Sequence, residues 1–253
     1  MKINPSVLVA AGALILSCLA ASALAAAAKP MDAAAIVADT TRPAADRELD
    51  ASRHPAELLA FLKIRPGDTV ADVWPGDYWD RLFADAVGSS GKVYAVHLIE
   101  ADAGEHRPTP PDGSMPLADH PNVISLAAHT NIFALPAKAD LIWMRQNYHD
   151  LYDKFVGPAD VPAFNKGVFN ALKPGGRFVV IDHSAVDGSK LEATEKLHRI
   201  DAAVVKADMA AAGFKFVGES NVLRNPSDDR TLLVFNPKVR GRTDQFVYVF
   251  RRP

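Results

Sequence analysis

Five short apolar runs alternate with helical segments along the chain, and this alternation is the feature that most constrains the fold. Each run is rich in Val and Ile and is bounded by Pro, Gly or Asn, which is typical of strands buried on both faces. The runs are Asp68–Val73, Lys92–Leu98, Asn122–Ala127, Ala139–Met144 and Arg177–Asp182. Strands that alternate with helices form a mostly parallel sheet covered on both faces. The sequence therefore predicts an α/β, Rossmann-like, doubly wound fold.

The helical segments and the end of the chain complete this prediction. The expected helices are Pro55–Ile64, Asp80–Val87, Val161–Leu172 and Leu191–Gly213. Three strand-like segments follow, at residues 214–220, 230–237 and 245–253, with no long helix between the last two. We therefore expect a seven-stranded sheet that ends in a C-terminal antiparallel hairpin. The proline-rich, aperiodic segment Ala101–Pro121 is long enough to be a flap over a site.

The N-terminus has the pattern of a secretory signal peptide. Lys2 precedes an apolar run from about Val7 to Leu19, and small residues lead to a cleavage position after Ala25. The apolar run is shorter than the roughly 20 residues that span a bilayer, so a membrane anchor is the weaker alternative. We expect residues 1–25 to be removed and the protein to be periplasmic or secreted. A lipoprotein acylated at Cys18 is a minor alternative.

Composition limits the remaining function classes. Residues 26–45 are rich in Ala and Pro and indicate a linker or arm, and residues 46–253 form the expected single domain. Cys18 is the only cysteine, so cleavage leaves no disulfide and no thiol nucleophile. With 28 basic and 30 acidic residues and no basic run, nucleic acid is not an expected partner. We expect a small-molecule substrate and no membrane span after cleavage, and nothing here indicates an oligomeric state.

The stretch "ADVWPGDYWDRLF", Ala71–Phe83, lies where many α/β proteins carry a glycine-rich nucleotide loop. Ligands of doubly wound sheets bind outside the carboxyl ends of the strands, where the strand order reverses. The first strand ends at Val73, which places this loop at that crevice. Gly76 is its only glycine, and it can supply both close backbone approach and conformational freedom at one position.

Several motifs carry a family resemblance. A strand, a Gly loop, a helix and a strand are followed by "ALKPGGRFVVID", and further marks are "WPG", "NYHDLY", "IDHSA", "LHRID", "LRNPSDD" and "GRTDQFVYVF". Over about residues 46–253 the chain resembles class I S-adenosylmethionine-dependent methyltransferases, in particular a bacterial group of predicted methyltransferases with signal peptides. The resemblance implies S-adenosylmethionine as cofactor.

The loop departs from the pattern of that family. The family usually has an acidic residue and then Gly-x-Gly-x-Gly; this chain keeps Asp72 and Gly76 but has Trp74 and Tyr78 at the outer glycine positions. The acidic residue that takes the ribose hydroxyls after the second strand is replaced by His97, which cannot match a bidentate carboxylate. We expect all five residues at the cofactor site. Trp74 and Tyr78 fit ligand contact and simple packing equally well, and Asp72 fits a role in holding the loop amides.

Two further segments carry charged candidates. Arg53 could bind the carboxylate of the methionine moiety in a bidentate contact, although a surface ion pair with Asp50 or Glu57 explains it slightly better. The segment Leu197–Asp201 places a histidine, an arginine and an aspartate on one expected helix, where a solvated face is the favoured interpretation.

The residues after the fourth strand are the catalytic candidates. Tyr148, His149 and Asp150 lie in "RQNYHD", at a position where related methyltransferases orient the acceptor. His149 could be a general base near neutral pH, Asp150 could set its tautomer, and Tyr148 could donate a hydrogen bond to the acceptor. A structural role for the histidine is equally compatible with the sequence.

A metal site is a further alternative at these strand ends. His149, Asp150, Asp182 and His183 would suit zinc or iron. None of them falls in a compact ligand spacing, so we expect no metal.

Three functions remain open. The leading hypothesis is transfer of a methyl group to a small molecule, mainly by holding the reactants aligned. Because S-adenosylmethionine is made in the cytoplasm, an exported protein could instead be a diverged, non-catalytic binding protein on the same scaffold. A hydrolase or lyase that uses His149 and His183 has the least support, because no serine or cysteine nucleophile motif accompanies them.

Overall fold

The structure is a computed structural model that describes residues 31–104, 117–157 and 159–253. The expected signal peptide, Cys18 and most of the expected flap lie outside these residues. None of the helices in the described ranges has the length and apolarity needed to cross a bilayer.

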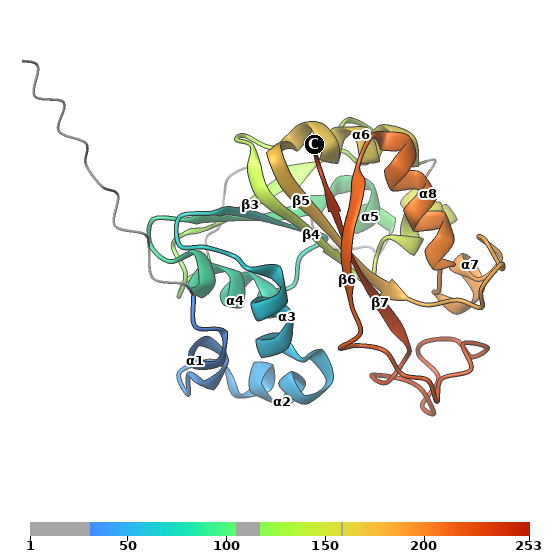
Figure 1. Ribbon diagram of the computed structural model, residues 1–253, viewed down its shortest axis with the longest axis horizontal. Coiled ribbons are helices and arrows are strands. Elements are labelled where there is room, and N and C mark those ends of the chain that lie inside the picture. The colour runs from blue at the N-terminus through green and yellow to red at the C-terminus, as the bar shows by residue number, and fades with distance from the viewer. Residues whose placement is uncertain (1–30, 105–116, 158) are drawn as a thin grey trace, which may run out of the picture.

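Seven strands form one sheet in the order β3-β2-β1-β4-β5-β7-β6 (Figure 1). Their bounds are β1 Thr69–Val73, β2 Lys92–Leu98, β3 Val123–Ala128, β4 Ala139–Arg145, β5 Leu172–His183, β6 Lys215–Ser220 and β7 Gln245–Arg251. β7 pairs antiparallel with both β5 and β6, and the other pairs are parallel. The predicted doubly wound, seven-stranded sheet with a C-terminal antiparallel hairpin is confirmed.

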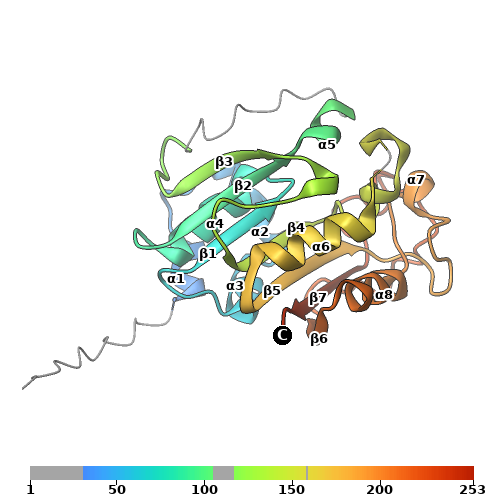
Figure 2. The same cartoon turned by 90° about the horizontal axis from the view of Figure 1, so that it is seen from above.

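Helices cover both faces of the sheet, as Figures 1 and 2 show. The α-helices are α1 Ala33–Ala38, α2 Ala44–Arg53, α3 Pro55–Leu62, α4 Asp77–Val87, α5 Ile99–Gly104, α6 Val161–Ala171, α7 Thr194–Leu197 and α8 Ala202–Ala212. Short 3₁₀ helices are η1 Thr130–Ile132, η2 His149–Tyr152 and η3 Lys154–Val156. One core cluster lies under α1, α3 and α4, and the other lies under α5, α6 and α8.

The strands are apolar throughout because successive side chains point to opposite faces and both faces are covered. In β4, Leu141 and Trp143 pack into the core under α4, whereas Ile142 and Met144 pack into the core under α6. The strand order reverses between β1 and β4, so the carboxyl ends of these two strands border the crevice where such sheets bind ligands.

Two expected elements are wrong. Residues 230–237 form turns rather than a strand, and β7 pairs instead with β6 across the intervening loop. The helix expected over Leu191–Gly213 is broken into α7 and α8, because residues 199–201 pair with the extended backbone after β5. Ile200 N–H donates to the His183 carbonyl at 3.0 Å, and Ala185 N–H donates to the Ile200 carbonyl at 3.0 Å. His198 ends α7 in the left-handed conformation with φ of 51°.

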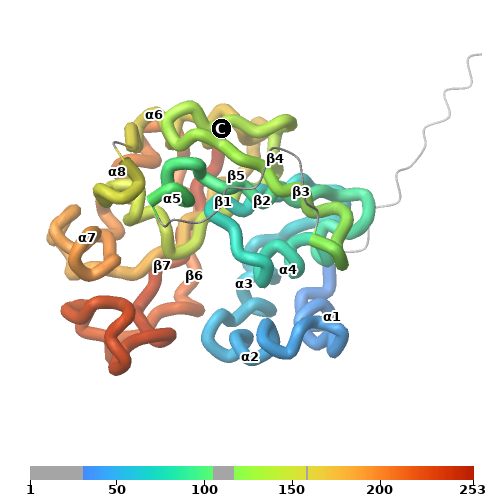
Figure 3. The backbone as a smooth tube through the Cα atoms, turned by 180° about the vertical axis from the view of Figure 1, so that it is seen from behind, coloured from blue at the N-terminus to red at the C-terminus, as the bar shows by residue number. Residues whose placement is uncertain are grey.

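The described part of the expected arm packs on the domain (Figure 3). Ala33 of α1 is buried in the core cluster under α4. The guanidinium of Arg42 donates to both carboxylate oxygens of Asp50 at 2.8 Å and to the Val37 carbonyl at 2.8 Å. Residues 31–45 are therefore anchored to α2 and the core rather than forming a free linker.

Candidate functional site

A cavity of about 350 Å³ opens at the carboxyl ends of β1 and β4. Its walls come from the loop after β1, the segment after β4, the end of β5, His198 between α7 and α8, and Val234 and Phe235 of the loop before β7. This volume lies within the range of small-molecule sites, roughly 300–1,000 Å³. The cavity therefore lies where the strand order predicted a ligand site.

Both central strands end in a non-glycine residue with left-handed backbone. Trp74 follows β1 and Gln146 follows β4, each with φ of 64°. The turns are tied to neighbouring strands, because Trp74 N–H donates to Val96 O at 2.9 Å and Gln146 N–H donates to Ile181 O at 2.7 Å. Such strained residues cost of order 1–3 kcal/mol each and cluster at functional sites. Trp74 thus adopts the backbone that the family's first glycine would take without strain.

The space above Gly76 is open. A Cβ atom placed on Gly76 would meet no heavy atom within 4 Å. Gly76 is the N-cap of α4, and its N–H donates to the buried carboxyl of Asp72. The predicted role of Asp72 in holding the loop is thus the one that the structure shows, and the amino end of α4 faces a hollow.

The two aromatic residues of the loop have different places. Trp74 is buried, lines the cavity and packs edge-to-face on Phe155 with ring centroids 6.1 Å apart. Tyr78 is not a lining residue; its hydroxyl donates to Asp50 Oδ1 at 2.7 Å. Burial and the Asp50 carboxylate raise the pKa of Tyr78. Tyr78 therefore leaves the hollow beside Gly76 free.

Arg53 and Arg145 bring two guanidinium groups to the cavity wall. Asp50 pairs with Arg42, and Glu57 contacts His54, so the surface ion pair favoured for Arg53 is not formed. The Arg53 guanidinium lies 4.3 Å from the centroid of the Tyr78 ring instead. Within the described ranges, no carboxylate forms an ion pair with Arg53 or Arg145. The cavity wall thus offers positive charge to an anionic ligand group.

Asp72 of the same wall lies near a second buried carboxyl group, that of Asp80. Burial, reinforced by the nearby Asp80, raises the pKa of Asp72 well above its ordinary value. Burial, with the nearby Asp77, raises the pKa of Asp80 to about 8. Burial and the neighbouring Arg53 lower the pKa of Arg145 to about 9. Both raised pKa values favour the protonated acids, so the pair offsets less of the arginine charge.

His149 is held by the carboxylate at the end of β5. Its ring Nδ1 lies 2.8 Å from Asp182 Oδ1, and its backbone N–H donates to Asp182 Oδ2 at 2.8 Å. Its Nε2 lies 3.0 Å from Asp150 Oδ1 and 3.2 Å from His198 Nδ1. Asp182 therefore sets the ring orientation, the role that the sequence analysis assigned to Asp150, and Asp150 lies on the opposite side of the ring.

Neighbouring charged groups shift the pKa values of His149 and Asp150. Burial alone would lower the pKa of His149, but Asp182 and Asp150 outweigh it and raise the pKa to about 10. Burial likewise opposes ionisation of Asp150, but contacts with His149 and His198 lower its pKa to about 2. In the metal-free protein His149 is thus a cation at neutral pH, which donates hydrogen bonds and is a poor general base.

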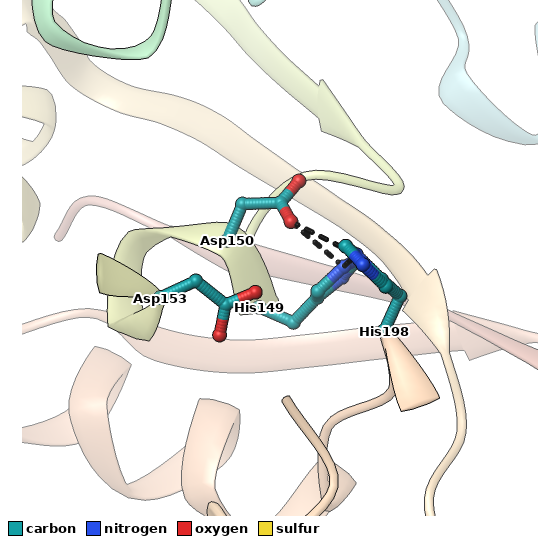
Figure 4. Close-up of side chains that lie close together, drawn as sticks. All are labelled: His149, Asp150, Asp153 and His198. Atoms are coloured by element: carbon teal, nitrogen blue, oxygen red, sulfur yellow. Dashed lines mark hydrogen bonds and ion pairs between the residues drawn. The ribbon is translucent and has the colours of Figure 1, made fainter. Parts of the chain in front are cut away.

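His198 and Asp153 complete the cluster around His149 (Figure 4). His198 Nδ1 lies 3.4 Å from Asp150 Oδ1. Asp153 follows η2 and is buried, and one potential ligand atom from each of the four residues lies within 4.8 Å of the others. The potential metal ligands that lie close together are therefore His149, Asp150, Asp153 and His198. The sequence had suggested Asp182 and His183 in place of Asp153 and His198.

The "LHRID" segment is buried rather than solvated. Arg199 is 0% exposed, and its guanidinium forms a bidentate pair with Asp228 at 2.8 and 3.1 Å. Asp201 caps α8 by accepting from Ala203 N–H at 2.9 Å. The solvated-face interpretation is wrong because the helix break turns these residues inward.

Of three other predicted or considered residues, two lie away from the cavity and one lines it. Tyr148 is fully buried on the α8 side, where its hydroxyl donates to Asp208 Oδ2 at 3.0 Å, so it does not line the cavity. His97 is not among the described lining residues, and its Nδ1 lies 3.3 Å from Asp102 Oδ2. His183 does line the cavity, with Nδ1 2.7 Å from the Thr243 hydroxyl oxygen. Burial and the nearby His149 lower the pKa of His183 well below its ordinary value.

The sequence analysis missed several wall residues. Arg145 ends β4, and Gln146 and Asn147 directly follow it, so their position at a strand end could have identified them. His198, Val234 and Phe235 come from segments assigned to a helix and a strand, and no local signal marked either segment as part of the site.

Comparison with solved structures extends the fold assignment. A S-adenosylmethionine-dependent methyltransferase from Aquifex aeolicus matches with a TM-score of 0.53 and 18% identity, over 88% of this chain and 99% of the other. The N-methyltransferase NodS from Bradyrhizobium japonicum matches with a TM-score of 0.51 and 12% identity, over 82% and 98%. No family model and no curated protein sequence matches the chain. The likenesses show the Rossmann-like fold of methyltransferases.

Proposed function

We propose that the protein is a S-adenosylmethionine-dependent methyltransferase that acts on a small-molecule acceptor. The observation that carries this proposal is the cavity of about 350 Å³ over an unobstructed Gly76, at the reversal of strand order in a methyltransferase fold. Asp72, Trp74 and Gly76 all line this cavity.

Two wall residues fit the carboxylate of the cofactor. S-adenosylmethionine carries a carboxylate, which Arg53 and Arg145 would hold through charge-assisted hydrogen bonds. Trp74 offers an apolar face, and the loop held by Asp72 gives backbone access at Gly76. When bound, the cofactor supplies an electrophilic methyl group on its sulfonium.

The cluster after β4 would position the acceptor. His149, held by Asp182, orients Asp150 through its Nε2, and the ionised Asp150 would accept a hydrogen bond from an acceptor N–H or O–H. Phe235 lies beside His198 with ring centroids 5.1 Å apart and would cover an apolar part of the acceptor. These residues contribute mainly by alignment, which can supply much of the barrier reduction.

Calorimetric titration of the purified protein tests the cofactor. We expect S-adenosylmethionine and its demethylated product to bind with dissociation constants in the micromolar range. Arg53→Gln should weaken binding about 10- to 100-fold, because a charge-assisted hydrogen bond is worth roughly 1.5–3 kcal/mol. Arg47→Gln, on the exposed face of the same helix α2, should leave binding unchanged.

A second candidate is a diverged binding protein without transfer chemistry. It is favoured by Trp74, which occupies a glycine position, and by His97, which contacts Asp102 instead of lining the cavity. Absence of binding at about 1 mM cofactor would contradict the methyltransferase and support this candidate.

We further propose that the protein works outside the cytoplasm, in the periplasm or as a secreted protein. The support is the apolar run after Lys2 and the small residues before Ala26. Sequencing of the N-terminus of the protein recovered from the periplasmic fraction should give a start at Ala26. An intact N-terminus in the cytoplasmic fraction would contradict export, and a chain starting at an acylated Cys18 would support the lipoprotein alternative.

A further inference from the structure

Three ligand-type atoms converge at one edge of the cavity. His149 Nε2, His198 Nδ1 and Asp150 Oδ1 form a triangle with sides of 3.0, 3.2 and 3.4 Å. In a tetrahedral zinc site with bonds of about 2.0–2.2 Å, the ligand atoms lie about 3.3–3.6 Å apart. The triangle is therefore close to one face of such a coordination sphere.

Asp153 supplies the fourth group. It is 3% exposed, and the Thr194 hydroxyl is the one donor beside its carboxylate among the described residues. The neighbouring Thr194 hydroxyl donates to the Leu191 carbonyl instead. A buried carboxylate without a partner is costly, and a cation would compensate it. Figure 4 shows the Asp153 side chain beside His149, and dashed lines that run from Asp150 to the histidines.

The surroundings orient the ligands as in known metal sites. A ligating histidine usually donates its other ring N–H to a carboxylate, which fixes the ring. Asp182 accepts from His149 Nδ1 at 2.8 Å and leaves Nε2 facing the cluster. Asp150 Oδ2 accepts from the Asn147 amide at 3.1 Å, which leaves Oδ1 for the cluster. His198 is held in a strained left-handed conformation, with φ of 51°.

Hydrogen bonds among these four side chains account for their arrangement less well than a bound cation does. One proton on His149 Nε2 and one on His198 Nδ1 can satisfy two sides of the triangle but not all three. Neither proton serves Asp153, whose carboxylate has only the Thr194 hydroxyl beside it among the described residues.

We propose that His149, His198, Asp150 and Asp153 bind one divalent transition-metal ion of the zinc class. Two imidazoles among the ligands favour zinc, cobalt or iron over magnesium and calcium, which prefer oxygen ligands. The site is separate from Arg53, Asp72 and Gly76, so metal binding does not depend on the proposed cofactor.

The test uses full-length protein stripped with a chelator and titrated with Zn²⁺ in the calorimeter, without S-adenosylmethionine. We expect one equivalent to bind with a dissociation constant below about 1 μM. Co²⁺, used as a spectroscopic probe, should give the intense visible absorption of tetrahedral coordination. His198→Gln should lower Zn²⁺ affinity more than about 100-fold, a larger loss than is typical for a residue that only orients a ligand.

Two controls separate ligand loss from misfolding. His129→Gln removes a histidine whose side chain is 55% exposed, and it should leave Zn²⁺ affinity unchanged. Circular dichroism should show that the His198→Gln variant keeps the native fold. Asp153→Asn should independently weaken Zn²⁺ binding. Absence of stoichiometric Zn²⁺ binding, or wild-type affinity in both native variants, would overturn the proposal and leave a hydrogen-bonded cluster. Cofactor binding by the metal-free protein is measured separately, so the two proposals can fail independently.

Discussion

Trp74 shows how one residue can both strain and fill a ligand loop. Its φ of 64° favours glycine, yet its indole is buried against Phe155. Burial of an aromatic side chain contributes several kcal/mol, whereas the left-handed conformation costs about 1–2 kcal/mol for an L-residue. Packing therefore outweighs backbone strain, and the chain keeps the turn of a glycine loop without the glycine.

A pair of variants separates these two contributions. Trp74→Ala and Trp74→Gly both lose the indole and should both lower the free energy of unfolding by about 3 kcal/mol. Trp74→Gly should nevertheless be more stable than Trp74→Ala by about 1 kcal/mol, because only alanine keeps the strain at positive φ. Urea unfolding of both proteins measures the difference. An alanine variant as stable as the glycine variant would show that the turn is unstrained.

At the residue scale, sequence reasoning succeeded where position along a strand decides the place of a side chain. Asp72 lies at the carboxyl end of β1 and His149 follows β4, and both reach the cavity. Tyr148, adjacent to His149, does not, because neighbouring residues of a tight turn point in different directions and only coordinates show which.

At the element scale, the break between α7 and α8 shapes the site more than any helix does. It brings His198 to the cavity and buries Arg199 between Asp228 and the Ser184 carbonyl. The Asp228 loop also supplies Val234 and Phe235 to the wall. Arg199 therefore holds two separate wall segments together.

Removal of this buried charge tests that role. Arg199→Met leaves Asp228 without its guanidinium partner, so we expect the free energy of unfolding to fall by about 3–5 kcal/mol. Lys154→Met, which breaks the exposed contact with Glu195, should cost less than about 1 kcal/mol. Chemical denaturation compares the two variants. Equal losses would contradict a special role for the buried pair.

The break itself was not visible in the sequence. Residues 191–213 contain no proline and no glycine before Gly213, so local propensity favoured one helix. Pairing of Ile200 with the backbone after β5 is a long-range interaction, and it overrides propensity. The strands of the parallel core, by contrast, were predicted because burial on both faces makes each of them a continuous apolar run.

At the scale of the whole molecule, the buried acids make stability depend on pH. Burial and Asp77 raise the pKa of Asp80 to about 8, whereas in the unfolded chain it ionises near pH 4. Between these values the folded state holds a proton that the unfolded state has lost. The free energy of unfolding therefore decreases as pH rises from about 4 to 8.

Asp80→Asn replaces the titrating carboxyl group with an amide. Relative to wild type, the variant should gain roughly 3–4 kcal/mol of stability at pH 8 compared with pH 5, because asparagine does not ionise. Glu192→Gln, which changes an exposed carboxylate, should follow the pH dependence of wild type. Urea unfolding at the two pH values measures the effect. Parallel pH profiles for Asp80→Asn and wild type would contradict the assigned ionisation.

The position of β7 has a consequence for how the molecule is completed. This strand consists of Gln245–Arg251, close to the C-terminus, yet it lies between β5 and β6 in the sheet. During synthesis, β5 has no neighbour on that side and β6 has no place in the sheet until β7 has left the ribosome. The wall formed by the end of β5 and the loop before β7 therefore cannot be assembled before β7 is made.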